Sequence, residues 1–182
     1  MRTASDYFAL FSLPQSWEID ANQLETRFRW LQQQFHPDRF ASHSEIEKRR
    51  AMEMAATINR AHQTLKDPLT RAQYLLELQG CDANQDNHTT ADGQFLVAQM
   101  MQRETLAEIR EADDTSDADR SRQALQSLSG EAQRDYLSLQ QQFSQHYRAE
   151  DYAQALDTLA KMQFAAKFVN EIIEFQNQLE DL

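Results

Sequence analysis

The stretch RFRWLQQQFHPDRFAS, residues 27–42, begins as an amphipathic helix and stops at the tripeptide His36-Pro37-Asp38. Proline cannot continue a helix, and it biases the residue before it toward an extended backbone. An aspartate in the following turn can accept backbone hydrogen bonds. The tripeptide is therefore at least a helix stop, and the question is whether His36 and Asp38 also serve a partner.

The segment before the tripeptide predicts a well-formed helix. Asp20 with Gln23 three residues later resembles a capping box, and apolar residues follow at helical spacing: Leu24, Phe28, Leu31 and Phe35. Arg27 lies on the flank of this stripe and Arg29 points outward. Trp30 lies off the stripe, which leaves two interpretations: partial exposure, or packing against the neighbouring helix, which we favour.

Two further helices flank this segment. A short one covers SDYFALFSL, with Ser5 or Asp6 as its N-cap and Pro14 closing it. A longer one covers residues 44–65, and its core face recurs at helical spacing through Ala51, Met54, Ala55, Ile58, Ala61, His62 and Leu65.

A fourth helix and a boundary follow. Asp67-Pro68 has the order of an N-cap followed by proline at the first helical position, and Gly80 ends this helix. Residues 81–92, CDANQDNHTTAD, are polar and without periodicity. They predict a domain boundary.

The second half predicts three helices, over residues 95–111, 117–147 and 151–182, with the acidic EADDTSDAD between the first two. Gly130 lies inside the second of them, where a kink or break is possible. The second helix has a seam of Leu125, Leu128, Ala132, Leu139 and Phe143. The third has Tyr152, Leu156, Leu159, Met162, Val169, Ile173 and Gln176 near heptad spacing. Three such helices joined by short loops make an up-down bundle.

Composition agrees with an all-α fold. Only three glycines and three prolines occur in 182 residues, of which 41% are hydrophobic, so helices are favoured over a sheet. The sequence contains no run of about 18 apolar residues, so we expect no membrane span. Its start lacks the basic-then-apolar order of a secretory signal. The chain has one cysteine, Cys81, which can make no internal disulfide. We expect Cys81 to act as a small apolar residue and the protein to reside in a reducing cytoplasm.

The net charge of −11 is unevenly distributed. Residues 1–79 carry ten basic and ten acidic side chains, whereas residues 80–182 carry eight basic and nineteen acidic ones. The two halves therefore present different electrostatic fields, and we expect them to meet different partners. Phosphate backbones would be repelled by the second half, so nucleic acid is not an expected partner.

The first half resembles the J-domain of J-protein co-chaperones. DYF.LF.L, the tripeptide between two long helices and INRAHQTLKDPLTRAQYLL occur in the family's order over residues 5–79. This resemblance implies that the tripeptide and the basic face of the preceding helix dock on a DnaK-type chaperone and stimulate its ATPase. The chain departs from the family at Arg39, where lysine is more usual, and at His62, where an aromatic is common. We expect His62 to be a packed core histidine.

The resemblance extends through the second half. No glycine/phenylalanine-rich linker or cysteine-rich module follows the first domain, and an acidic helical bundle containing FLVAQMMQRETLAEI does. The whole chain is similar to the HscB family, J-domain co-chaperones of iron–sulfur cluster assembly. The absence of a cysteine module favours a bacterial form. The implied organisation is all-α: a J-domain over residues 1–79, a linker over 80–92 and a three-helix scaffold-binding bundle over 93–182.

This resemblance implies two sets of site residues and no cofactor or metal. The chaperone, of HscA type, would be bound by His36, Pro37, Asp38, Arg27, Arg29 and Arg39. The cluster scaffold protein, of IscU type, would be bound by Leu96, Val97, Met100, Met101, Glu104, Glu108 and Phe164. Met101 stands where some relatives have an acidic residue. From the residues alone, an apolar stripe rimmed by acids can select a basic partner, but Leu96 and Met100 could equally belong to the bundle core.

Other classes of function remain as alternatives. An enzyme or metal protein would use His36, Asp38 and His43 as a facial triad, but no glycine-rich phosphate loop or paired carboxylate accompanies them. A J-domain protein with a different client would share the first half and differ in the second. A purely structural helical bundle would use the tripeptide only as a stop signal. We expect no enzyme activity and no bound cluster.

Overall fold

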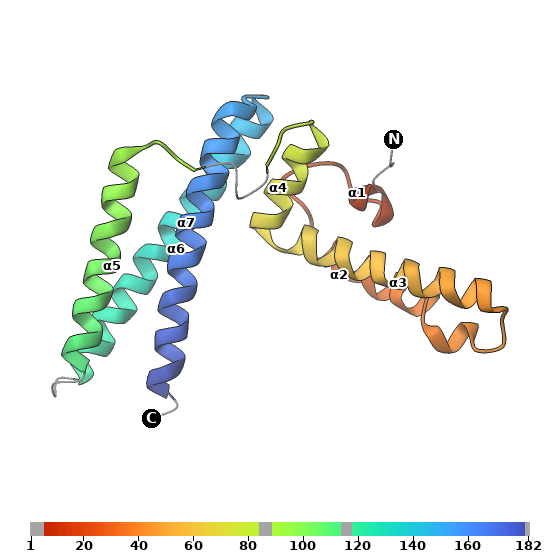
Figure 1. Cartoon of the computed structure of the whole chain (residues 1–182), viewed down its shortest axis with the longest axis horizontal. Helices are drawn as coiled ribbons and strands as arrows, with labels where there is room; N and C mark the ends of the chain where they lie inside the picture. Colours follow the sequence, from red (N-terminus) through yellow and green to blue (C-terminus); the bar gives the residue numbers. More distant parts are fainter. Residues whose placement is uncertain (1–5, 84–88, 114–117, 181–182) are drawn as a thin grey trace. The chain divides into compact units, whose positions relative to one another are not determined.

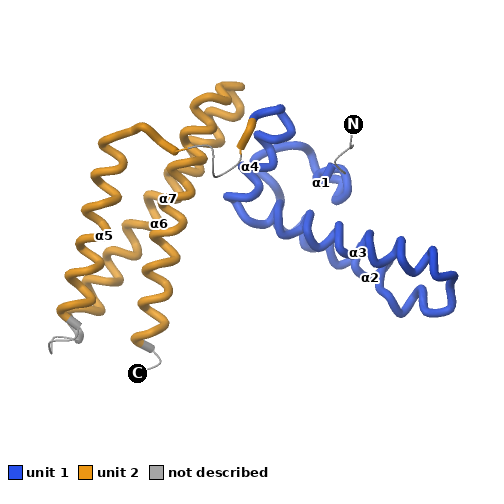
Figure 2. The backbone as a smooth tube through the Cα atoms, in the orientation of Figure 1, with its two compact units in different colours: residues 1–81 blue, residues 82–182 orange. Residues whose placement is uncertain are grey.

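The computed structural model describes residues 6–83, 89–113 and 118–180, and within these ranges the chain is helical, with no strand. It forms two compact units, residues 1–81 and 82–182 (Figure 2). The all-α prediction is confirmed. The elements are labelled in Figure 1: α1 (Tyr7–Leu10), α2 (Ala21–Gln34), the 3-10 helix η1 (Pro37–Phe40), α3 (Glu45–Lys66), α4 (Pro68–Leu78), α5 (Gly93–Asp113), α6 (Ala118–Arg148) and α7 (Tyr152–Glu180).

The first helix is shorter than expected, and Pro14 does not end it. Asp6 is the N-cap, and its side chain accepts from the Phe8 N–H; Ser5 lies outside the described residues. After Leu10 the chain reverses through Ser12, which has a φ of 55°. The Leu13 N–H donates to the Phe8 carbonyl at 2.9 Å, as in a Schellman motif. This reversal ends the helix before Pro14 and leaves Leu13 buried in the core.

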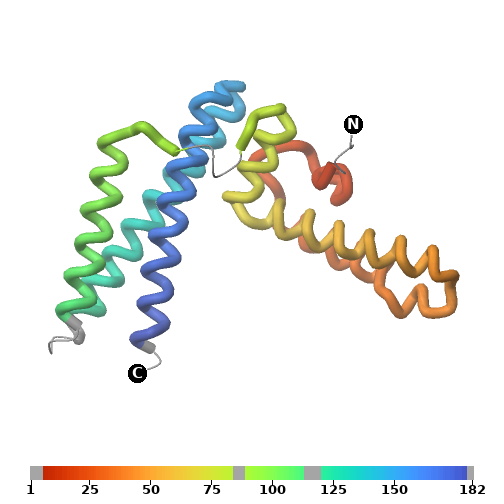
Figure 3. Tube along the Cα trace, in the orientation of Figure 1, coloured from red at the N-terminus to blue at the C-terminus, as the bar shows by residue number. Residues whose placement is uncertain are grey.

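The helices α2 and α3 form an antiparallel hairpin, which the coloured trace in Figure 3 follows through the η1 turn. Asp20 caps α2 by accepting from the Asn22 and Gln23 N–H groups. The complete capping box lies at the start of α3, between Ser44 and Glu47. The hairpin buries Leu24, Leu31, Ala51, Ile58, Ala61 and Leu65. On the expected α3 core face, Met54 is exposed and Ala55 is half-buried.

The short helices cover one end of this hairpin. Asp67 caps α4 through the Thr70 N–H, and Pro68 is its first residue, as the sequence predicts. The α4 residue Tyr74 accepts from the Tyr7 N–H at 3.0 Å and stacks on the Tyr7 ring. These contacts attach α1 to α4.

The second unit is built on the long pair α6 and α7, with α5 packed beside both. Its core combines Leu106, Ile109, Leu125, Leu128, Ala132, Phe168, Ile172 and Phe175. The expected seam position Ile173 is wrong: Ile173 is 40% exposed, whereas Ile172 is 1% exposed. The buried face of this part of α7 runs through Phe168, Ile172 and Phe175, one position earlier than the predicted seam.

The helix α6 is continuous through Gly130, so the break considered from the sequence does not occur. The expected start of this helix at Asp117 lies outside the described residues. A Cβ atom added at Gly130 would meet only the end of the Arg134 side chain, at 3.4 Å. The backbone there is helical, and a side chain has room.

We therefore expect Gly130→Ala to raise the free energy of unfolding of the second unit by about 0.5–1 kcal/mol, because alanine has the higher helix propensity. Gly80 gives the matched control, because its φ of +78° is unfavourable for other residues. Gly80→Ala should lower stability by about 1–2 kcal/mol. Denaturant unfolding followed by helical circular dichroism measures both, and equal signs for the two variants would contradict this.

Candidate functional site

The His-Pro-Asp turn, residues 36–38, lies exposed between α2 and α3. His36 has an extended backbone, with φ −63° and ψ 132°, and is the N-cap of η1. Its Nδ1 accepts from the Asp38 N–H at 3.3 Å. Because Nδ1 accepts this hydrogen bond, it carries no proton. Its distance of 3.6 Å from Asp38 Oδ2 is therefore a contact and not an ion pair. The turn thus orders itself and leaves the Asp38 carboxylate, 90% exposed, open to a partner.

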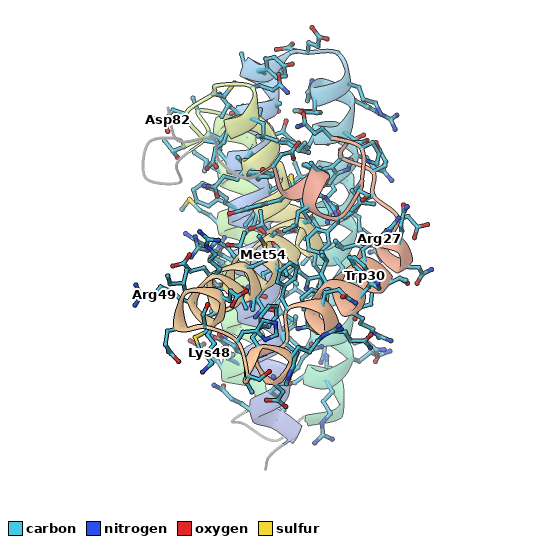
Figure 4. All side chains as sticks on the ribbon, turned by 90° about the vertical axis from the view of Figure 1, so that its right-hand side faces the viewer. Arg27, Trp30, Lys48, Arg49, Met54 and Asp82 are labelled. Atoms are coloured by element: carbon cyan, nitrogen blue, oxygen red, sulfur yellow. The ribbon has the colours of Figure 1, made fainter. Side chains whose placement is uncertain are left out.

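The basic residues expected beside the turn are exposed. Arg39 donates from Nη1 to the Gln33 carbonyl at 3.4 Å, and Arg29 donates from Nε to Glu25 at 3.0 Å. Arg27 lies three residues before Trp30, so the two share one side of α2 (Figure 4). Trp30 is 54% exposed, so of the two interpretations the partly exposed one is correct and the favoured packed one is not.

A groove of about 770 Å³ opens beside the turn, between the end of α2 and the middle of α3. It brings together four of the six residues expected to bind the chaperone, all except Arg27 and Asp38. Its lining is Arg29, Gln32, Gln33, Phe35, His36, Pro37, Arg39, Ala55, Ile58 and Asn59. A lining that combines arginines with apolar side chains suits a partner segment that carries both carboxylates and apolar side chains.

The alternative of a metal triad finds no support in the geometry. Within the described ranges, no three His, Cys, Asp or Glu side chains come together as ligands, and this includes His36, Asp38 and His43. The His43 ring instead lies against the Phe40 ring at 5.2 Å between centroids.

The second surface is the α5 outer face, which we define as Leu96, Val97, Met100, Met101, Glu104 and Glu108. These residues repeat at helical spacing, and all except half-buried Leu96 are exposed. Met100 is 71% exposed, so it does not belong to the bundle core. Phe164 of α7 is half-buried and meets Phe95 of α5 edge-on, with ring centroids 6.3 Å apart. Phe164 therefore borders the start of the face through Phe95.

Polar contacts hold the first turn of α5 against α7. We define the α5 clamp as Thr90, Asp92, Asp157 and Lys161. Lys161 Nζ lies 2.8 Å from Asp92 and 3.0 Å from Asp157, and Thr90 donates to Asp157 at 2.7 Å. Asp92 also caps α5 by accepting from the Gln94 and Phe95 N–H groups. The clamp therefore sets where α5 begins and how its outer face is presented.

Arginines of α5 continue the attachment toward its other end. Arg103 lies over the Phe168 ring at 5.2 Å and Arg110 over the Phe175 ring at 5.0 Å. The arginines and the phenylalanines are each seven residues apart, so the same contact repeats after two turns. Arg103 also pairs with Glu171 at 3.4 Å. These contacts turn the remaining side of α5 outward.

The sequence interpretation missed the clamp and the arginine contacts. Asp157 and Lys161 at i and i+4 are a visible local signal. Asp92 is 69 residues from Lys161, and Arg103 is 65 residues from Phe168. No local pattern joins residues so far apart, so only the packed bundle reveals these contacts.

Comparisons with known proteins agree with this architecture. A family model described as the HSCB C-terminal oligomerisation domain matches residues 91–173. The co-chaperone protein HscB homolog of Vibrio cholerae serotype O1 is 41% identical over 175 residues, covering 96% of this chain and 98% of that protein. The solved structure of chaperone HscB from Vibrio cholerae matches with a TM-score of 0.83 and 38% identity, over 95% of this chain and 98% of that chain. Human co-chaperone protein HscB matches with a TM-score of 0.84 and 27% identity, over 97% and 84%.

The fold is thus a J-domain followed by a helical domain. The chain belongs to the HscB family of co-chaperones. In the part of the chain that the structure describes, no helix combines the length and apolar character needed to cross a membrane.

The clamp gives a pH prediction. The hydrogen bond from Lys161, helped by the Phe95 and Gln94 N–H groups, holds the pKa of Asp92 below its ordinary value of 3.8. A depressed carboxyl pKa stabilises the fold above the ordinary value, and this contribution is lost as the pH falls through the depressed one. We expect an NMR titration to show Asp92 ionising below 3.8, and Lys161→Met to raise its midpoint while keeping the apolar stem. An unchanged midpoint in that variant would show that Lys161 does not hold the carboxylate.

Proposed function

We propose that the protein is an adaptor of iron–sulfur cluster assembly in the cytoplasm. It binds the cluster scaffold protein of IscU type through the α5 outer face and Phe164. It brings this scaffold to an HscA-type, DnaK-like chaperone, whose ATPase it stimulates through His36, Pro37, Asp38, Arg27, Arg29 and Arg39. It has no catalytic activity of its own, and its two domains, residues 1–79 and 93–182, divide the two binding tasks.

The observation that carries the first half is the self-capped, exposed His-Pro-Asp turn with cationic side chains beside it. Because His36 orders the turn from within, the Asp38 carboxylate reaches the partner without a large loss of backbone freedom. Stimulation of an ATPase is a shift between chaperone states, and it requires contacts that differ between them. A turn of fixed geometry next to a groove can make such contacts.

The α5 outer face supports the second half. Val97, Met100 and Met101 form an exposed apolar patch on one helix, and Glu104 and Glu108 extend it with negative charge. Apolar contacts provide most of the binding free energy, and the acids favour a partner with basic side chains at matching positions. Binding both partners at once raises the effective concentration of the scaffold at the chaperone.

We expect His36→Gln to abolish stimulation of ATP hydrolysis by an HscA-type chaperone. Glutamine changes the N-cap of η1 and removes the imidazole that the partner would contact. Single-turnover ATPase assays with and without the scaffold protein measure this. Wild-type stimulation should rise synergistically with scaffold and weaken as salt rises.

Three outcomes would contradict parts of this proposal. Stimulation that ignores the scaffold would indicate a different client. Salt-independent affinity would exclude the cationic contact. No stimulation by the wild-type chain would leave the tripeptide as a helix stop.

For the scaffold surface, we expect Met100→Ala to weaken scaffold binding by about 1–2 kcal/mol, from the apolar area that the side chain would bury. Leu137→Ala on α6 is the matched control, because Leu137 is exposed to 56% outside the proposed face. Isothermal titration calorimetry with the scaffold protein compares them. Equal affinities of the two variants would move the binding site away from α5.

A further inference from the structure

A buried histidine is linked through Glu25 to Arg29, a residue of the proposed chaperone-binding face. His62 of α3 is 8% exposed, and its ring stacks on the Phe28 ring of α2, with centroids 3.8 Å apart and planes 10° from parallel. The sequence prediction of a packed core histidine is therefore correct as far as packing goes. The ring also has a polar partner, because Nε2 lies 3.1 Å from Glu25 Oε2.

Glu25 joins this buried ring to the surface. Its Oε2 contacts His62, and its Oε1 accepts from Arg29 Nε at 3.0 Å. The hydrogen bond from Arg29 is the main cause that lowers the pKa of Glu25, and His62 adds to it. Glu25 is therefore a carboxylate near neutral pH, and a carboxylate can only accept. His62 is accordingly the donor, from Nε2.

The geometry leaves part of Arg29 open to a partner. The contact with Glu25 engages Nε, and the Arg29 side chain is 72% exposed. Arg29 also lines the groove beside the His-Pro-Asp turn. A guanidinium held by Nε can direct its terminal nitrogens toward a carboxylate of the chaperone.

We propose that His62 is a positioning residue for chaperone docking: by donating to Glu25, it holds the carboxylate that orients Arg29 at the groove. This inference rests on the proposed function, because it concerns the same chaperone-binding face. A free Glu25–Arg29 pair at i and i+4 on a helix surface is weak and samples several rotamers. A donor fixed by burial and stacking restricts Glu25, and through Glu25 it restricts Arg29.

Two substitutions separate the donor from the packing. His62→Phe keeps an aromatic ring on Phe28 and removes the donor, whereas His62→Gln loses the ring and keeps an amide N–H that can reach Glu25. We expect His62→Phe to raise the concentration for half-maximal ATPase stimulation about two- to threefold, a modest change as befits a surface ion pair. The maximal stimulation should stay unchanged, and His62→Gln should stay near wild type.

The opposite order would overturn the inference. If His62 only fills the core, the phenylalanine variant keeps wild-type affinity and the glutamine variant loses it together with thermal stability. Equal losses in both variants would also indicate packing alone. Glu25→Gln is a second test at an accessible position, and it should weaken docking as His62→Phe does. In an Arg29→Ala background, His62→Phe should have no further effect, because the residue through which it acts is absent.

A measurement on the full chain alone keeps this test independent of the chaperone. NMR can measure the rate at which the Arg29 Nε–H proton exchanges with water. We expect this rate to be similar in wild type and His62→Gln, and higher in His62→Phe. Wild-type exchange in His62→Phe would refute the positioning role even if the chaperone is stimulated. If exchange is faster in His62→Phe than in wild type but the wild-type chain does not stimulate the chaperone, the contact is supported and the proposed function is rejected.

Discussion

The reversal of the chain at His36-Pro37 is the constraint on which the first unit depends. Proline ends α2, and the capping box between Ser44 and Glu47 restarts the helix as α3. The two helices then lie antiparallel and bury one common apolar seam. The backbone groups of the turn are satisfied by His36 from within, which leaves Asp38 exposed. One short segment thus closes the hairpin and presents the groups that we propose for chaperone binding.

In the second unit, one helix, α5, is both packed against the core and exposed on its outer face. The far half of α5 contributes Leu106 and Ile109 to the core. Its near half is attached by the α5 clamp, and Arg103 and Arg110 lie over aromatic rings farther along the helix, so the near half needs little apolar contact. Val97, Met100 and Met101 consequently remain uncovered without detaching the helix. Neighbouring exposed apolar side chains on an ordered helix are what a protein-binding surface offers.

The distribution of charge matches this division of surfaces. The first 79 residues are neutral overall, yet arginines gather beside the His-Pro-Asp turn, whereas the remainder carries the whole charge of −11. Two partners with opposite charge patterns can then be bound without competing for one face. The contacts of Glu25 with His62 and Arg29 link the packed core of the hairpin to a side chain at the groove.

The sequence by itself determined the long helices, the caps at Asp20 and Asp67 and the stop at Pro37, because these depend on residues three or four positions apart. Through the family resemblance, it also indicated the residues that we propose for the two binding surfaces. Only the tertiary structure decided that Trp30 is exposed, that Ile172 rather than Ile173 is buried, and that Met100 faces outward. It alone joined Glu25 to His62, 37 residues away, and Asp92 to Lys161, 69 residues away. Such contacts depend on how whole helices pack, and packing depends on the combined shape of many side chains rather than on any local pattern.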